Sequence, residues 1–317
     1  MCILQDNFGR AIRYLRLSVT DRCNYRCAYC MAERGGLKRA PGGILSIGEL
    51  AEIGGAAVRC GVKKIRLTGG EPLMRRGILR LCERLRENEG LEELALTTNG
   101  ALLGAMAADL RAAGVERLNV SLDTLRPERF RALTRRGELR DVLRGLDAAR
   151  AAGFSGTKLN VVLLGGVNDG EIADFVALTR TEEFSVRFIE LMPMGESAAF
   201  PRERFLSADA VLAAVPELER AGNDGVAELY RAPGYRGTVG LIRPMTRCFC
   251  ASCDRIRVTA DGKLKPCLHS AEEISLRGAH GAALEAAIRA GAAAKPARHS
   301  LTAGGSASAR EMYAIGG

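Results

Sequence analysis

Hydrophobic positions in the first two thirds of the chain alternate between two spacings. Short apolar runs rich in β-branched residues are followed by Ala-, Leu- and Arg-rich stretches in which apolar residues recur every three or four positions. The first pattern indicates strands and the second indicates amphipathic helices. The predicted strands are Tyr14–Val19, Lys64–Thr68, Glu93–Thr98, Arg117–Ser121, Thr157–Leu163 and Val186–Glu190. The predicted helices are Ile47–Cys60, Ile78–Asn88, Leu103–Ala113, Asp141–Ala152 and Asp169–Arg180.

Six strands that alternate with helices predict parallel βα units in an α/β fold. Right-handed crossovers then favour either a barrel-like or an open arrangement. After about Gly225 the pattern changes to short strands separated by turns, in "AELYRAP", "TVGLIRP", "RIRVTAD" and "KLKPCL". We therefore expect two domains, residues 1–225 and a smaller β-rich C-terminal domain of residues 226–317.

Polar, Gly and Pro residues come directly after four of the predicted strands, in "RLTGGEP", "TTNG", "SLDT" and "ELMPMG". In βα barrels, the loops at the carboxyl ends of the strands build the active site. A cysteine-rich loop follows the first strand at the same edge. The sequence therefore predicts a functional site there.

Composition narrows the class of protein. The chain has 317 residues, of which 47% are hydrophobic and 26% charged, as in globular proteins. No apolar run approaches the roughly 20 residues of a membrane helix, and the start lacks the basic and apolar regions of a signal peptide. We expect a cytoplasmic protein without a membrane partner. The net charge of +9 suits an anionic partner such as nucleic acid, a nucleotide or an acidic surface.

Three of the ten cysteines, Cys23, Cys27 and Cys30, lie within eight residues directly after the first strand. Soft thiolates in such a loop suit an iron–sulfur cluster or a zinc ion. Structural zinc prefers four protein ligands, and neither His nor a fourth Cys is near. A [4Fe–4S] cluster with three Cys ligands leaves one iron open for a small molecule.

A second group has the spacing Cys250-x2-Cys253-x13-Cys267, and Cys248 is a further candidate beside it. Taken alone, this group suits a zinc ribbon that is completed by Cys248 or His269. It equally offers three thiolates for a cluster. Spacing does not separate these two interpretations.

The C-x3-C-x2-C loop, with Tyr29 before its last Cys, and "TGGEP" together resemble the radical S-adenosylmethionine (SAM) superfamily. The whole chain resembles the GTP 3′,8-cyclases, the family of molybdenum cofactor biosynthesis protein A. The matching stretches are "DNFGRAIRYLRLSVTDRCNYRCAYCM", "GVKKIRLTGGEPLMR", "LALTTNG", "RLNVSLDTL", "RFIELMPMG", "FCASCDRIRVTADGKLKPCL" and the terminal "IGG". The sequence departs from the family pattern in having the additional Cys248 and in lacking a Pro after "CM".

This resemblance implies an incomplete (β/α)6 TIM-type barrel with the smaller β-rich C-terminal domain. It implies SAM and two [4Fe–4S] clusters, one on Cys23, Cys27 and Cys30 and one on Cys250, Cys253 and Cys267. A 5′-deoxyadenosyl radical from SAM would take hydrogen from C3′ of GTP, and attack on C8 would give 3′,8-cyclo-7,8-dihydro-GTP. This reaction is the first step of molybdopterin biosynthesis.

The resemblance also assigns residues to the two small molecules and to the tail. Those expected at SAM are Tyr29, Gly70, Ser121 and Met192. Those expected at GTP are Arg16, Arg66, Thr97, Lys158, Arg255, Ile256 and Arg257. The terminal Gly316 and Gly317 are expected to reach into the active site. The alternative for the cations is ion pairing with Glu71, Asp123 or Glu190.

The expected partners are GTP, an external one-electron donor, and cyclic pyranopterin monophosphate synthase, which receives the product; a homodimer is left open.

Two other functions are alternatives to the cyclase. A peptide-modifying radical SAM maturase usually has a longer, Cys-richer C-terminal region. A basic zinc protein that binds nucleic acid needs an exposed Lys/Arg face or stacking aromatics, and only 5% of the residues are aromatic. We therefore expect no nucleic-acid partner.

Overall fold

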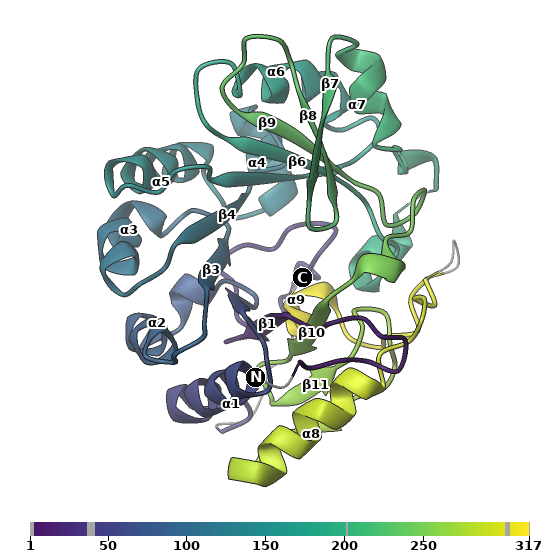
Figure 1. Cartoon of the computed structure of the whole chain (residues 1–317). Helices are drawn as coiled ribbons and strands as arrows, with labels where there is room; N and C mark the ends of the chain where they lie inside the picture. The colour runs from purple at the N-terminus through teal and green to yellow at the C-terminus, as the bar shows by residue number, and fades with distance from the viewer. Residues whose placement is uncertain (1–2, 37–41, 201, 302–304, 317) are drawn as a thin grey trace.

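A single curved sheet runs through the computed structural model, which describes residues 3–36, 42–200, 202–301 and 305–316. Its strand order is β12-β11-β10-β1-β2-β3-β4-β5-β6-β9-β8-β7. The central strands follow the order of the chain and are parallel (Figure 1). They are β1 (Tyr14–Ser18), β2 (Lys64–Thr68), β3 (Glu93–Thr98), β4 (Arg117–Ser121), β5 (Lys158–Leu163) and β6 (Ser185–Glu190).

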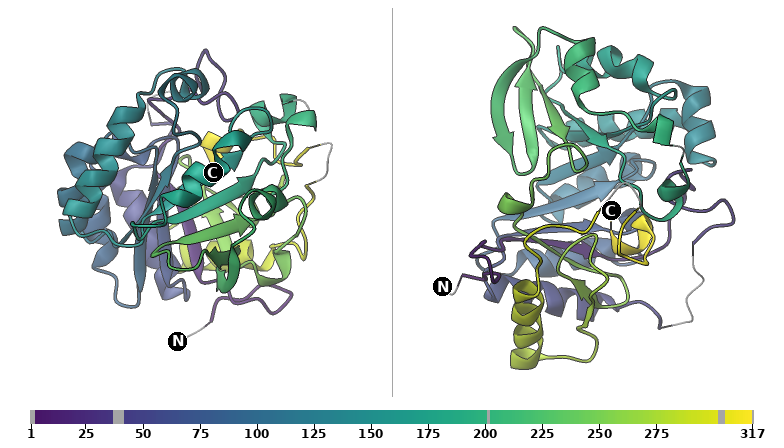
Figure 2. Two further views of the ribbon diagram at one scale, coloured as in Figure 1. Left: turned by 90° about the horizontal axis from the view of Figure 1, so that it is seen from above. Right: turned by 90° about the vertical axis from the view of Figure 1, so that its right-hand side faces the viewer.

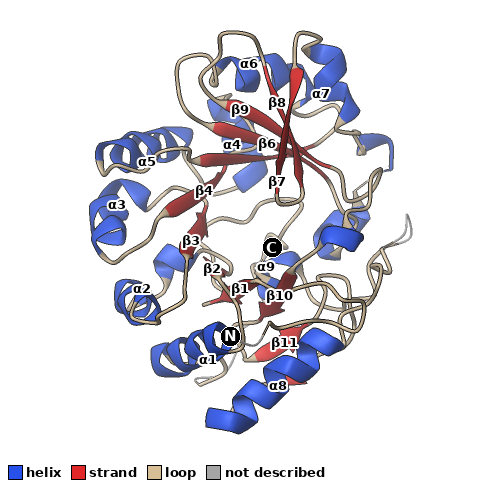
Figure 3. Cartoon of the chain, in the orientation of Figure 1, coloured by secondary structure: helices blue, strands red, loops and turns tan. Residues whose placement is uncertain are grey.

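Helices cover the outer face of this sheet (Figures 2 and 3). They are α1 (Ile47–Arg59), α2 (Ile78–Arg86), α3 (Leu103–Ala112), α4 (Pro127–Thr134), α5 (Leu139–Ala151), α6 (Ile172–Ala177) and α7 (Asp209–Ala214). Helix α1 shows how the sequence sets a boundary. The side chain of Ser46 accepts a hydrogen bond from the Glu49 N–H, and the Glu49 carboxylate accepts one from the Ser46 N–H. This reciprocal cap fixes the start of the helix.

Side chains alternate between the two faces of each strand, and this alternation separates core from site. In β1 and β2, Leu15, Leu17, Ile65 and Leu67 belong to the buried hydrophobic core between sheet and helices. Arg16, one position from both leucines, instead lines a cavity on the inner side. Each buried Leu or Ile contributes roughly 1.5–3 kcal/mol to folding.

The C-terminal strands extend both edges of the sheet. Strand β9 (Thr238–Ile242) pairs in parallel with β6, and β10 (Arg255–Val258) pairs in parallel with β1. Beyond them lie antiparallel strands: β8 (Ala227–Arg231) and β7 (Glu219–Asp224) at one edge, β11 (Lys263–Lys265) and β12 (Ile274–Ser275) at the other. The two edges do not pair with each other within the described residues, so the expected incomplete barrel with β-rich C-terminal strands is confirmed.

Two C-terminal helices complete the architecture. Helix α8 (Gly281–Ala293) packs on α1 outside the sheet, and the short α9 (Met312–Ile315) lies in the middle of the barrel (Figure 1). None of the described helices is long and apolar enough to cross a membrane. The proposed division at residue 225 falls in the turn between β7 and β8.

The central strands agree with the sequence predictions to within one residue at each end. The predicted helix Asp169–Arg180 is instead a 3₁₀ turn, Asp169–Glu171, followed by α6. A physical reason is visible at Glu171, whose buried carboxylate accepts hydrogen bonds from the Thr124 hydroxyl and the Leu125 N–H. Satisfying that carboxylate holds the first turn against the loop after β4.

Candidate active site

The first cysteine trio lies in the loop that leaves β1. The loop is held against the end of α4 by hydrogen bonds from Arg26 N–H to Thr134 O and from Ala28 N–H to Leu133 O, both 2.9 Å. Cys23 Sγ accepts a hydrogen bond from the Tyr25 N–H at 3.4 Å. The backbone thus fixes the positions of the three half-buried thiols before any ligand binds.

Burial makes these thiols hard to ionise without a cation. Burial raises the pKa of Cys23 to about 11 and that of Cys30 to about 12, and raises that of Cys27 well above its ordinary value. Among the residues that the structure describes, the three sulfurs do not lie within 4.8 Å of one another as a set. Three thiols that need a positive partner, spaced too widely for one ion, fit a multi-iron cluster.

A cavity of about 220 Å³ adjoins this trio. Its lining includes all four residues expected at SAM: Tyr29, Gly70, Ser121 and Met192. The Tyr29 hydroxyl donates a 2.6 Å hydrogen bond to Asp123, which holds the ring in place. Thr97, expected at GTP, also lines this cavity, and its buried hydroxyl has no hydrogen-bond partner in the described part of the chain.

The two glycines of "TGGEP" are required by close packing. A Cβ on Gly69 would lie 2.3 Å from the carbonyl oxygen of Thr20, and one on Gly70 would lie 2.3 Å from that of Arg22. Both carbonyls belong to the segment that leads into the cysteine loop. The motif therefore allows the cysteine loop to pack closely against the end of β2. This role is independent of any contact with SAM.

The second trio lies at another cavity, of about 310 Å³. Cys250 begins the 3₁₀ turn Cys250–Ser252, Cys253 follows that turn, and Cys267 follows β11; all three line the cavity. Burial raises the pKa of Cys250 to about 11. Burial alone would raise the pKa of Cys253. The positive charge of Lys295 and a backbone hydrogen bond from Arg255 outweigh burial and lower this pKa. These three sulfurs too are not within 4.8 Å of one another as a set, within the described ranges.

Positive side chains crowd this second cavity. They are Arg16, Lys64, Arg66, Lys158, Arg187, Arg255, Arg257 and Lys295, against the acids Asp224 and Asp254. Burial, with the nearby Arg257, lowers the pKa of Arg16, and burial with Arg255 lowers that of Arg257 to about 10. Buried cations of like charge are unfavourable unless an anion neutralises them. The cavity is therefore suited to a highly charged anion.

The acids considered as partners for these cations have other contacts. Glu71 accepts hydrogen bonds from the Thr98 hydroxyl and the Asn99 N–H. Asp123 binds Tyr29, and Glu190 binds Thr246. That pairing hypothesis is wrong for Lys158, whose ammonium lies 2.6 Å from Asp224.

Arg66 forms hydrogen bonds with a phenol and an amide, and no acid among the described residues pairs with it. It donates hydrogen bonds to the Tyr14 hydroxyl and, at 2.6 Å, to the side-chain oxygen Oδ1 of Asn119. Its charge therefore stays available to the cavity.

The tail enters the barrel. Arg257 donates a 2.9 Å hydrogen bond to the carbonyl oxygen of Gly316. Met312 of α9 lines both cavities, and Tyr313 lines the first. Gly317 lies outside the described residues.

The two cavities adjoin each other, since they share the lining residues Asn160, Ile189, Met192 and Met312. The structure thus brings both trios and most of the expected residues to two adjoining cavities. Ile256 differs, because its fully buried side chain packs in the core behind β10. Ile256 lines neither of the two cavities.

Sequence reasoning missed several cavity residues, chiefly Arg187, Asn160 and Lys295. A signal existed for Arg187, because on β6 it alternates with the buried Val186 and Phe188 and so must face the barrel interior. No local signal existed for Lys295, which follows α8 and reaches the site only through the tertiary fold.

Comparison with known proteins defines the class first. The model of the Radical SAM superfamily matches residues 17–179, and that of the Molybdenum Cofactor Synthesis C family matches residues 184–301. The solved SuiB of Streptococcus suis is similar in fold, with a TM-score of 0.58 at 14% identity, covering 89% of this chain and 65% of that one. This chain thus spans about two thirds of SuiB, and the likeness concerns the fold alone. The chain is a radical SAM protein, a class that implies a [4Fe–4S] cluster and SAM.

Proteins with similar sequences then define the family. "GTP 3′,8-cyclase" of Peptoclostridium acidaminophilum is 50% identical to this chain, covering 99% of it and 98% of the relative. "GTP 3′,8-cyclase" of Geobacter sulfurreducens is 48% identical, covering 95% of each. The chain belongs to the GTP 3′,8-cyclase family.

Proposed function

We propose that this chain converts GTP into 3′,8-cyclo-7,8-dihydro-GTP, the first step of molybdopterin biosynthesis. The observation that carries the proposal is a pair of adjoining cavities, each lined by a cysteine trio, of which the second is also lined by eight Lys and Arg side chains. A nucleoside triphosphate fits these cavities because it carries roughly four negative charges and guanidinium groups bind phosphate oxygens in pairs.

In this proposal, Cys23, Cys27 and Cys30 hold the SAM-binding [4Fe–4S] cluster, and Tyr29, Gly70, Ser121 and Met192 contact SAM. When bound and reduced, these groups supply a 5′-deoxyadenosyl radical. The protein positions the substrate and excludes water. The buried loop and the Tyr29–Asp123 hydrogen bond support that role, because they hold the cavity wall in place.

Cys250, Cys253 and Cys267 would hold the second [4Fe–4S] cluster, which by the family resemblance would bind the guanine of GTP. Arg16, Arg66, Lys158, Arg255 and Arg257 would neutralise the triphosphate, Thr97 would donate a hydrogen bond, and Ile256 would contribute its backbone. Gly316 and Gly317 would reach into the active site, as the family resemblance implies. The cation-lined cavity beside the second trio supports this arrangement.

The wider setting follows from the same chemistry. The reaction requires an external one-electron donor, and the product passes to cyclic pyranopterin monophosphate synthase. We place the protein in the cytoplasm, with residues 1–225 as the SAM domain and 226–317 as the cluster and GTP domain.

Anaerobic incubation with reductant, SAM and GTP tests the proposal. We expect 5′-deoxyadenosine and the cyclised nucleotide to form in equal amounts, and about eight irons per chain from two four-iron clusters. A Cys23→Ser variant should give neither product. Formation of 5′-deoxyadenosine with GTP unchanged would refute the cyclase assignment, and zinc in place of iron would refute the radical chemistry.

A further inference from the structure

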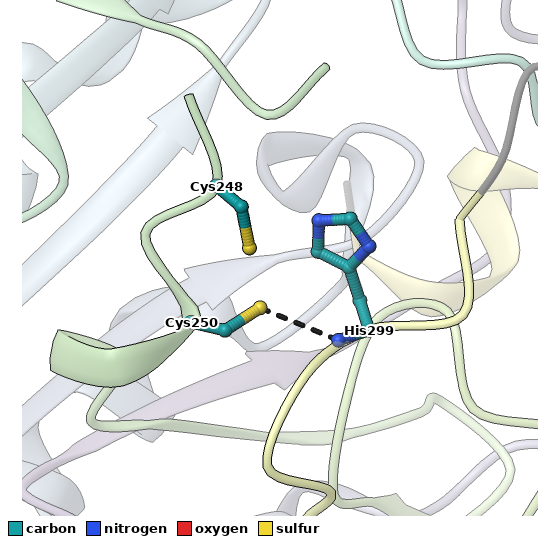
Figure 4. A group of neighbouring side chains, drawn as sticks. All are labelled: Cys248, Cys250 and His299. Carbon is teal, nitrogen blue, oxygen red and sulfur yellow. Dashed lines mark hydrogen bonds between the residues drawn. The ribbon is translucent and has the colours of Figure 1, made fainter. Parts of the chain in front are cut away.

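Three ligand atoms meet beside the second cavity in a grouping that the proposed function does not use. Among the described residues, Cys248, Cys250 and His299 bring one ligand atom each within 4.8 Å of one another (Figure 4). The cysteines come from the loop after β9, and His299 comes from the segment after α8. In neither cysteine trio do the three sulfur atoms lie this close to one another, within the residues that the structure describes.

His299 is oriented toward the two sulfurs by contacts on both its backbone and its ring. Its backbone N–H donates a 3.3 Å hydrogen bond to Cys250 Sγ, and its Nδ1 accepts one from the Leu301 N–H at 3.2 Å. Nε2 is buried and makes no hydrogen bond of ordinary geometry within the described part of the chain. Burial lowers the pKa of His299, although the backbone of Pro244 lies near enough to the ring to counter part of this shift. Figure 4 shows the imidazole turned with this edge toward Cys248 and Cys250.

We propose that the cluster-free chain binds a single zinc ion through Cys248 Sγ, Cys250 Sγ and His299 Nε2. Two thiolates and one imidazole form a donor set that zinc prefers, and water can complete the tetrahedron. Ligand atoms around tetrahedral zinc lie roughly 3.5–3.8 Å apart, given bonds of about 2.0–2.3 Å. Closing the group therefore needs a shift of at most about 1 Å, which the exposed Cys248 has room to make.

The proton and charge balance of binding is simple. Both thiols lose their protons to solvent, and the ring proton moves from Nε2 to Nδ1, so the hydrogen bond from Leu301 is given up. Two thiolates neutralise Zn²⁺, so the local charge does not change. His269, the other histidine near the second trio, is engaged elsewhere, since its Nδ1 lies 3.1 Å from the Ser306 hydroxyl.

Cys250 belongs to both this site and the proposed second cluster, so the two metals exclude each other. Cys248 does not line the cavity that holds Cys253 and Cys267, but faces an outer hollow with Arg220 and Arg247. The cluster therefore does not need Cys248, whereas zinc does. The mutual exclusion of zinc and the second cluster rests on the proposed function, because it assumes that this cluster binds Cys250. Zinc binding to the cluster-free chain does not depend on the proposed function.

Zinc titration of a cluster-free chain tests the site. A background with Cys23, Cys27 and Cys30 changed to Ser removes the first trio, and a competing chelator reports affinity under anaerobic conditions. We expect one zinc per chain, bound at least about tenfold more weakly after Cys248→Ser or His299→Ala, because even outer-shell changes cost this much. Cys267→Ser is the matched control and should leave the affinity unchanged.

The opposite result, loss of zinc with Cys267→Ser but not with Cys248→Ser, would overturn the site and favour a zinc ribbon. Because Cys248 is exposed, Cys248→Ser is not expected to disturb folding, so its result is decisive even where His299→Ala is unstable.

Cluster assembly in the same background tests the exclusion. Without zinc, iron and sulfide should give about four irons per chain, and failure here would count against the second cluster and the proposed function. Pre-loading with one equivalent of zinc should reduce this to nearly none, and Cys248→Ser should restore it. Four irons in the zinc-loaded chain with Cys248 intact would overturn the exclusion alone.

Discussion

The guanidinium of Arg257 holds the carbonyl oxygen of Gly316 at 2.9 Å and so ties the penultimate residue to β10. Gly316 has a φ of +78°, in the left-handed region that favours glycine. A Cβ there would lie 2.1 Å from the Thr68 hydroxyl at the end of β2. The seat of the tail is therefore shaped for a residue without a side chain.

Gly316→Ala should displace the tail from the barrel. Both the backbone strain and the contact with Thr68 oppose the substitution, so we expect cyclised product to fall at least about tenfold, a cost near 1.4 kcal/mol in positioning. Iron content and GTP-independent SAM cleavage should be unchanged. Gly170→Ala is the control, since no atom lies within 4 Å of its Cβ position. Equal activity of the two variants would contradict a role for the tail.

Arg255→Ala should weaken GTP binding while SAM cleavage persists. Arg255 lies over the Tyr14 ring at 5.3 Å, and its buried Nε has no hydrogen-bond partner among the described residues. A charged hydrogen bond contributes roughly 1.5–3 kcal/mol, so we expect a loss of about 10- to 100-fold in affinity, measured by calorimetry. Arg117→Ala, at the exposed start of β4, should bind GTP normally. Unchanged affinity in Arg255→Ala would place GTP elsewhere.

Tyr14 gives the cavity a dependence on pH. Burial would raise the pKa of its hydroxyl, but the charges of Arg66, Arg16, Arg255 and Lys64 outweigh burial and lower it to about 7. Bound triphosphate would neutralise those cations and raise the pKa again. GTP binding should therefore take up a proton, and affinity should fall as the pH rises above 7.

The pH dependence can be assigned with one variant. Between pH 7 and 8 the affinity of the chain for GTP should fall by up to about fivefold. Tyr14→Phe should keep only the dependence that comes from GTP itself, so the difference between the two proteins isolates Tyr14. Identical pH profiles from calorimetric titrations would show that Tyr14 stays protonated throughout.

The local sequence pattern was sufficient to predict the central parallel strands β1 to β6. It was not sufficient to predict the strands that extend the sheet at its two edges. The alternation in β1 and β2 follows from one face packing against helices, so their limits are readable from the sequence. The pairing of β10 with β1 joins residues more than 200 positions apart, and no local pattern encodes it. Strand β7, exposed at every position, has no large apolar residue to signal a strand.

The candidate site also has features that the sequence makes visible and features that only the tertiary fold creates. The sequence singled out the cysteine trios because thiols at short spacing are typical of metal ligation, and their role as cluster ligands stays a prediction. The contact of Lys158 with Asp224 was not predictable from the sequence, because Asp224 lies on β7 and reaches Lys158 only through the long connection after β6. The same holds for His299 beside Cys250, where two distant segments meet.

Asp224 competes with an anion for two cavity cations, since its carboxylate lies 2.6 Å from the Lys158 ammonium and 2.7 Å from the Arg187 guanidinium. Asp224→Asn removes a negative charge from the cavity, so GTP affinity should increase about three- to tenfold, a modest change because Asp224 is 43% exposed and solvent screens it. The increase should shrink at high salt. Asp209→Asn, whose partner Arg243 lies outside the cavity, should leave affinity unchanged. Weaker binding by Asp224→Asn would mean that Asp224 holds Lys158 and Arg187 in their binding positions.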